Sequence, residues 1–177
     1  MQKTILYIAS SLDGYIAGKD DDLSWLEPYQ DVDYDFQGFY KNIGAIVVGR
    51  KTYDIEVKNG WDRVHQAPRI VLSKRVPVAG STPPDVAFMH DDLSAVLIAA
   101  RKRAGRKDVW LEGGADVAQQ FISQGRVDEI ILTLAPVLLG DGIRLFDTMH
   151  AQPSLSLQNV RQFDRGLVQL CYTIRKE

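Results

Sequence analysis

Cysteine is almost absent from this sequence. Cys171 is the single one in 177 residues, so a disulfide within the chain is excluded. Its neighbours Leu170 and Tyr172 give it an apolar context, which is typical of a buried core thiol rather than of a reactive one. We assign it no catalytic role.

Long hydrophobic runs are absent as well. No stretch approaches the roughly 20 apolar residues that span a bilayer. Residues 1–8 have a strand-like pattern in place of the charged and then apolar regions of a signal peptide. The sequence therefore predicts a cytoplasmic protein without a membrane partner.

Positive charge is not in excess: 21 Lys and Arg stand against 23 Asp and Glu, a net charge of −2. Nucleic-acid-binding proteins normally carry a basic field, so we expect no nucleic-acid partner. The three histidines, His65, His90 and His150, are scattered, and neither CxxC nor HExxH occurs. We therefore predict no metal site.

The remaining composition, 45% hydrophobic and 25% charged, is that of a globular domain, and the length predicts a single domain over residues 1–177. Alternating strands and helices predict an α/β sheet that is parallel at its centre, with an antiparallel pair at the C-terminus. Residues 10–22 and 136–147 are expected to be irregular loops. Strands are expected at 4–9, 45–49, 69–73, 86–90, 109–112, 129–135, 155–160 and 167–174, and helices at 31–42, 50–54, 92–104 and 116–124.

Glycines follow the strand expected at 109–112, in the sequence VWLEGGAD. Ligands of α/β proteins bind at the carboxyl ends of strands, and a helix that starts there offers free N–H groups to phosphate. The same motif is equally compatible with a tight strand-to-helix turn that binds nothing. It is not a GxGxxG fingerprint.

Cations follow two further strands. Gly49, Arg50, Lys51 and Thr52 come after one apolar strand, and Leu72-Ser73-Lys74-Arg75 ends the next. Arginine binds phosphate with two parallel hydrogen bonds, although either pair of cations alone is equally compatible with a solvated surface. Together the three strand ends predict a basic, glycine-lined rim for a ligand with several phosphates.

Four motifs then match a known family in order along nearly the whole chain. They are ASSLDGYIA at 9–17, VGRKTY at 48–53, EGGA at 112–115, and Thr133 with GDG at 140–142. The chain resembles the dihydrofolate reductase-like superfamily, and most closely the reductase domain of the bifunctional riboflavin-biosynthesis deaminase/reductase. The resemblance implies a three-layer dihydrofolate-reductase-type α/β fold, with helices on both faces of a mixed, mostly parallel sheet.

The resemblance also implies NADPH as the cofactor. The basic rim suits its 2′-phosphate and pyrophosphate, while Gly113 and Gly114 are expected to form a Gly-Gly peptide that is often cis in such proteins. The cofactor-binding residues implied by the resemblance are Ala9, Ile16, Ala17, Gly49, Arg50, Lys51, Thr52, Leu72, Ser73, Lys74, Gly113, Gly114, Ala115, Asp116 and Val117.

Catalytic and substrate residues follow from the same resemblance. Glu112 and Asp13 are the candidate catalytic carboxylates; the alternatives are a structural role for Glu112 and a turn-shaping role for Asp13. Asp33, Phe36 and Thr133 are the candidate substrate-binding residues, although a cap or a solvated side chain is the more common role for an aspartate such as Asp33. Residues 10–25 are expected to form a lid over the nicotinamide, helped by Leu23 and Trp25.

The predicted function is hydride transfer from NADPH to a small heterocyclic or sugar-linked substrate, either a pterin or folate or a compound like 5-amino-6-(5-phosphoribosylamino)uracil. Two alternatives stay open: a nucleotide-binding or regulatory protein without catalysis, and a scaffold that keeps only the fold. The resemblance further implies a homodimer formed through sheet edges and the apolar stretch 134–139, which is equally compatible with internal core.

Overall fold

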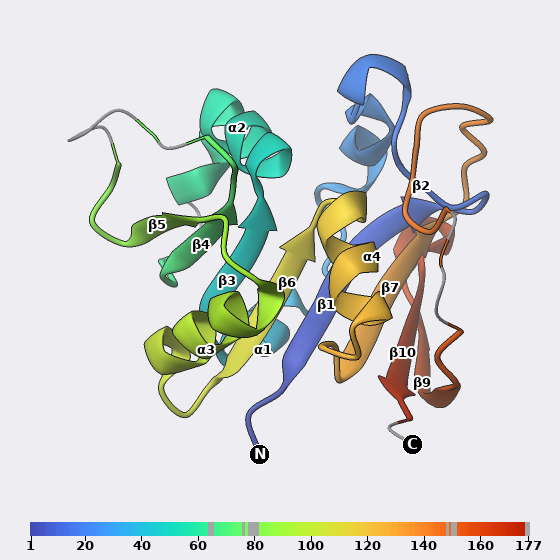
Figure 1. Ribbon diagram of the computed structural model, residues 1–177. Coiled ribbons are helices and arrows are strands. Elements are labelled where there is room, and N and C mark those ends of the chain that lie inside the picture. The colour runs from blue at the N-terminus through green and yellow to red at the C-terminus, as the bar shows by residue number, and fades with distance from the viewer. Residues whose placement is uncertain (64–65, 76, 78–81, 148, 150–151, 176–177) are drawn as a thin grey trace.

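The computed structural model describes all residues except 64–65, 76, 78–81, 148, 150–151 and 176–177. An eight-stranded sheet with the order β5-β4-β3-β6-β1-β7-β10-β9 runs through it (Figure 1). Its strands are β1 (Thr4–Ser11), β3 (Ile43–Gly49), β4 (Arg69–Leu72), β5 (Val86–Met89), β6 (Asp108–Gly113), β7 (Glu129–Ala135), β9 (Leu155–Gln162) and β10 (Val168–Ile174). The longer helices are α2 (Arg50–Asn59), α3 (Leu93–Ala104) and α4 (Ala115–Ser123).

The central strands are apolar on both sides because both faces of the sheet are covered. Leu6, Val47 and Leu111 face the core under α3 and α4. Their neighbours in sequence, among them Tyr7 and Trp110, face the second core, where a short helix α1 (Phe36–Tyr40) packs. Figure 1 shows α3 and α4 in front of the sheet and α1 behind it. The mostly parallel, three-layer architecture predicted from the sequence is therefore confirmed.

The C-terminal strands are antiparallel, as predicted. β10 pairs with β7 on one side and with β9 on the other, and a register shift lies between Cys171 and Tyr172. Cys171 is only half-buried on β10, so its expected place in the core is wrong. β9 forms the edge of the sheet and leaves Leu157 and Val160 exposed.

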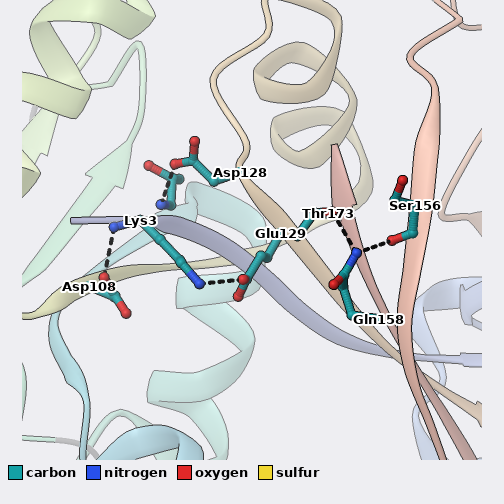
Figure 2. Close-up of polar contacts among 8 residues, drawn as sticks. Lys3, Asp108, Asp128, Glu129, Ser156, Gln158 and Thr173 are labelled. Carbon is teal, nitrogen blue, oxygen red and sulfur yellow. Dashed lines mark hydrogen bonds and ion pairs between the residues drawn. The ribbon is translucent and has the colours of Figure 1, made fainter. Parts of the chain in front are cut away.

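Polar contacts fix the N-terminal end of β1 between its two parallel neighbours (Figure 2). The Lys3 backbone N–H donates to Asp108 at 2.7 Å, and the Thr4 N–H donates to Asp128 at 2.8 Å. The Lys3 ammonium also pairs with Glu129, its Nζ lying 2.5 Å from Oε1. These contacts tie β1 to the starts of β6 and β7, at the end of the sheet opposite its carboxyl edge.

The helix expected at 31–42 is wrong for its first half. Only Phe36–Tyr40 is helical, because Asp35 takes a left-handed conformation at φ 60°. Asp31 lies before this helix, and its carboxylate pairs with Arg165, whose Nη2 lies 2.5 Å from Oδ2. Helical spacing of the apolar residues arose here from two separate contacts: Val32 packs beside Trp25, and the aromatic residues of α1 pack on the sheet.

The two expected loops contain a strand pair that the sequence did not reveal. β2 (Tyr15–Ala17) lies in the segment 10–22 and pairs with β8 (Ile143–Arg144) in the segment 136–147. Short 3-10 turns follow at Lys19–Asp21, called η1, and at Ser24–Tyr29. Helix α2 also continues five residues beyond its expected end at Asp54.

Within the described part of the chain, we find no helix with the length and apolar character needed to cross a membrane.

Candidate functional site

A cavity of about 850 Å³ opens at the carboxyl edge of the parallel strands. The ends of β3, β4 and β6 meet there because these strands are adjacent and parallel. The volume lies within the range usual for small-molecule sites, roughly 300–1,000 Å³. The candidate cofactor residues that line this cavity are Ala9, Ile16, Ala17, Gly49, Arg50, Lys51, Thr52, Leu72, Ser73, Lys74, Gly114, Ala115, Asp116 and Val117.

The turn from β3 into α2 brings two cations to the rim of the cavity. Arg50 binds Asp54 one helical turn away, with Nε 2.8 Å from Oδ1, and its guanidinium lies 5.3 Å from the centre of the Phe88 ring. Lys51 pairs with Asp21 of η1, with Nζ 2.6 Å from Oδ1. Both cations are thus held by carboxylates that also line the cavity.

Glycines at the ends of β3 and β6 leave room for the starts of α2 and α4 to approach them closely. A Cβ at Gly49 would meet Val117 Cγ2 at 3.0 Å. The peptide between Gly113 and Gly114 is cis, as the resemblance implies, and Gly113, the last residue of β6, is outside the cavity lining. A Cβ at Gly114 would meet the Thr52 hydroxyl at 3.1 Å. Side chains at these positions would therefore fill the junction where α2 and α4 begin.

The end of β4 contributes a polar loop to the same rim. Ser73 donates its N–H to the Met89 carbonyl at 2.9 Å, and its hydroxyl accepts the Arg75 N–H at 3.1 Å. Lys74 and Arg75 are exposed and line the cavity. The opposite wall is apolar, with Ile8, Ala9, Ile16, Ala17, Leu23 and Leu26.

Two carboxyl groups lie in the wall between these sides. Glu112 near the end of β6 and Glu56 of α2 both line the cavity, close enough for each carboxyl group to act on the pKa of the other. Arg69, almost fully buried, lies with Nε 3.8 Å from Glu56 Oε2. Burial, followed by the charge of Glu56, raises the pKa of Glu112 well above its usual range. Burial also raises the pKa of Glu56. The sequence had no role for Glu56 because α2 was expected to end before it.

Asp13 lies outside the cavity lining. Its carboxylate accepts the Ser11 hydroxyl at 2.6 Å and the backbone N–H groups of Leu139 and Gly140 at 3.1 and 2.8 Å. The Ser11 hydroxyl and then the Gly140 and Leu139 amides lower the pKa of Asp13 to about 2. Such a carboxylate fastens one loop to another and is a poor proton donor, so the structure places Asp13 in a turn-shaping role.

The three candidate substrate residues also lie outside the cavity lining. Asp33 is exposed and accepts the Asp35 N–H at 2.9 Å. Phe36 stacks with Tyr40 in the aromatic cluster behind the sheet. Thr133 is buried and accepts a hydrogen bond from Gln169 at 3.1 Å.

The expected lid is divided between two places. Asp21 and Leu23 line the cavity, whereas Trp25 is buried in a separate cluster with Val32, Ala135 and Leu167. Sequence reasoning also missed four lining residues: Trp61 after α2, His90 and Asp91 after β5, and Gln120 in α4. Position after a strand end was the available signal for His90 and Asp91, and helical spacing from Asp116 for Gln120.

The fold and the site together define a class: an α/β protein of the dihydrofolate reductase type, with a cation-rimmed cavity at the carboxyl edge of its sheet. The chain belongs to the RibD C-terminal domain family, whose model matches residues 2–169.

The chain is similar to proteins of about its own length and to part of a longer protein. The uncharacterized protein YyaP of Bacillus subtilis is 32% identical, with 97% of this chain and 94% of YyaP covered. The riboflavin biosynthesis protein RibD of Corynebacterium ammoniagenes is 30% identical over 78% of this chain but only 44% of its own length. A putative riboflavin biosynthesis protein from Shewanella sp. PV-4 superposes with a TM-score of 0.88 at 28% identity, with 99% of this chain and 100% of that chain covered.

Proposed function

We propose that this protein is an NADPH-dependent reductase of a small heterocyclic or sugar-linked substrate. The observation that carries the proposal is the division of the cavity into a cationic rim and an apolar wall. A dinucleotide with a charged phosphate portion and a flat nicotinamide portion requires such a division. Membership of the RibD C-terminal domain family supports the same activity.

The residues present fit this cofactor. Helices α2 and α4 both begin at the cavity, and helix N-termini favour phosphate. Arg50, Lys51, Ser73 and Lys74 supply charge and hydroxyl donors beside them. Gly49 and Gly114 leave the backbone of this rim without side chains, where a Cβ would meet Val117 or Thr52.

When bound, NADPH supplies a hydride. The chain's residues do the rest: the cations bind phosphates, and Ile8, Ala9, Ile16 and Ala17 exclude water from the nicotinamide side. Glu112 lines the same cavity, and burial raises its pKa well above its usual range, which favours the protonated form that can donate a proton.

Two observations support a substrate class. The chain belongs to the RibD C-terminal domain family, and a protein of the same fold from Thermotoga maritima is named as a deaminase and 5-amino-6-(5-phosphoribosylamino)uracil reductase. Asp33, the candidate carboxylate for a pterin ring, lies outside the cavity lining. We therefore favour a phosphoribosylamino-pyrimidine type of substrate over dihydrofolate.

Titration with NADPH and, in parallel, NADH tests the cofactor. Trp61 lines the cavity and is 43% exposed, so its fluorescence reports on binding there. A Trp61→Phe variant is the matched control, because Trp25 and Trp110 are buried elsewhere. We expect micromolar NADPH binding, much weaker NADH binding, and loss of most quenching in the variant. No binding of either dinucleotide would refute the proposal.

Consumption of NADPH with 5-amino-6-(5-phosphoribosylamino)uracil and with dihydrofolate tests the reaction. We expect turnover with the first compound and little with the second. Tight NADPH binding without turnover across pyrimidines, pterins and folates would favour the nucleotide-binding alternative.

We also propose a homodimer. The edge strand β9 exposes Leu155, Leu157 and Val160, and an exposed apolar edge strand favours pairing with a second chain. Leu138 is 70% exposed within the stretch 134–139, while Val137 and Leu139 pack inward. Light scattering on the purified protein should give twice the 19.9 kDa chain mass, and the mass of one chain would exclude the dimer.

A further inference from the structure

Three ionisable side chains from three elements converge at the wall of the cavity. In β6, Glu112 follows Trp110 at the period of two that keeps side chains on one face of a sheet. In β4, Arg69 has the same relation to Val71, which packs in the same core as Trp110. Helix α2 follows β3, the strand between them, and brings Glu56 to both.

The charges of this group balance only if one proton stays bound. Glu56 is 8% exposed and Arg69 is 1% exposed, so water compensates neither. One guanidinium offsets one carboxylate, and a second carboxylate beside the first would be repelled in a medium of low dielectric constant. One proton on the pair brings the net charge of the three groups to zero.

The buried oxygens agree with this balance. Glu112 Oε2 and Glu56 Oε2 are both inaccessible to solvent and accept no hydrogen bond from the described residues. Burying a carboxyl oxygen without a hydrogen bond costs less free energy when the group is a neutral carboxylic acid than when it is a carboxylate. The charged form loses more hydration energy on burial.

Other ionisable groups surround the trio. Asp62, in the turn after α2, adds a negative charge that acts on Glu56. Tyr53 of α2 lies near Arg69, Asp62 and Asp85. The negative charges oppose ionisation of the pair, and Arg69 is the cation that favours it. The direction of the balance therefore favours the protonated state of Glu112.

We propose that Glu56 is a positioning residue that keeps the Glu112 carboxyl protonated, with Arg69 as fixed countercharge, and that this proton is the one the reduction consumes. The role in reduction rests on the proposed function. The carbon of the substrate's C=N or C=O bond accepts the hydride with both its electrons, and the π pair passes to nitrogen or oxygen. That atom takes the proton from Glu112, which water reprotonates after the product leaves.

Infrared spectroscopy of the protein without cofactor tests the held proton. A buried carboxylic acid gives a C=O band above the amide region that shifts in D₂O. We expect one such band at neutral pH in the wild type and its loss in Glu112→Gln. In Glu56→Gln the band should vanish at lower pH than in the wild type, because the negative charge of Glu56, which opposes ionisation of Glu112, is gone. Glu27→Gln, an exposed carboxyl outside the cavity, should change nothing.

Glu56→Asp is the second variant if Glu56→Gln does not fold: it keeps the charge but withdraws the carboxyl, and should give a smaller shift in the same direction. A wild type without the band, or a pH midpoint unmoved in a folded Glu56 variant, would overturn the proposal.

Titration with NADPH separates this proposal from the proposed function, since both Gln variants should bind NADPH within about two-fold of the wild type. Loss of NADPH binding in both would overturn the assignment to the proton step. A chain that binds no NADPH but shows the band and its shift would refute the proposed function and, with it, the use of the proton in reduction. The role of Glu56 in holding the proton on Glu112 would then still stand.

Discussion

Lys51 and Asp21 form an ion pair across the rim of the cavity, with Nζ 2.6 Å from Oδ1. Lys51 is in the first turn of α2, and Asp21 lies in η1, just after β2. The pair therefore joins the phosphate side of the cavity to the segment expected as a lid. A phosphate arriving at Lys51 competes with Asp21 for the same ammonium group.

Replacing Asp21 by Asn should tighten NADPH binding. The variant removes the competing carboxylate and leaves Lys51 free, and exposed ion pairs are worth up to about 1 kcal/mol. We expect the Kd for NADPH to fall by about two- to five-fold, measured by Trp fluorescence at low salt. Asp20→Asn removes an equal charge from the same turn and is the matched control. An equal effect in both variants would indicate a general charge effect.

Lys74→Gln should weaken binding of NADPH selectively. Lys74 is exposed after β4 and faces the cavity that the 2′-phosphate would enter. A charge-assisted hydrogen bond is worth about 1.5 kcal/mol, so we expect about a tenfold higher Kd for NADPH and little change for NADH. Lys58→Gln, in the last turn of α2 and outside the cavity lining, should leave both constants unchanged. Equal loss for both dinucleotides would place the 2′-phosphate elsewhere.

Gly142→Ala should destabilise the protein strongly. Gly142 has φ 131°, and a Cβ there would meet the Ala17 carbonyl oxygen at 2.1 Å, where β2 and β8 pair. We expect a loss of about 3 kcal/mol or more in the free energy of unfolding by urea. Gly140→Ala is the control, since Gly140 also has positive φ but open space around it, and should cost about 1–2 kcal/mol. Equal losses would show that the close approach to Ala17 contributes nothing.

The contribution of Asp13 to stability should disappear in acid. Its hydrogen bonds lower its pKa from 3.8 to about 2 in the folded chain, so the unfolded chain binds a proton first as the pH falls. The stabilisation is complete above about pH 4 and is lost as the pH falls toward 2. Urea unfolding of the wild type and Asp13→Asn should therefore differ at neutral pH and converge at about pH 2. A constant difference would contradict the linkage.

Much of the cavity rim was predictable from the sequence. Apolar runs that end in Gly49-Arg50, Leu72-Ser73 and Glu112-Gly113 identify strand ends, and parallel strands bring such ends to one edge. The helix predicted from apolar spacing is wrong over residues 31–35. The apolar residues there pack in two different places, but their spacing along the sequence is the same as that of one helical face. Apolar spacing also missed β2 and β8, which are too short to show a pattern and are stabilised only by each other.

The sequence alone determined the layers of this protein, since buried strands must be apolar on both faces and helices on one. It also determined which residues follow the strand ends. Only the tertiary structure decided that Asp13 fastens a loop and that Glu56, Arg69 and Glu112 meet in one buried group. Those contacts join residues distant along the chain, and the protonation of a carboxyl depends on burial and on neighbours that no local pattern encodes.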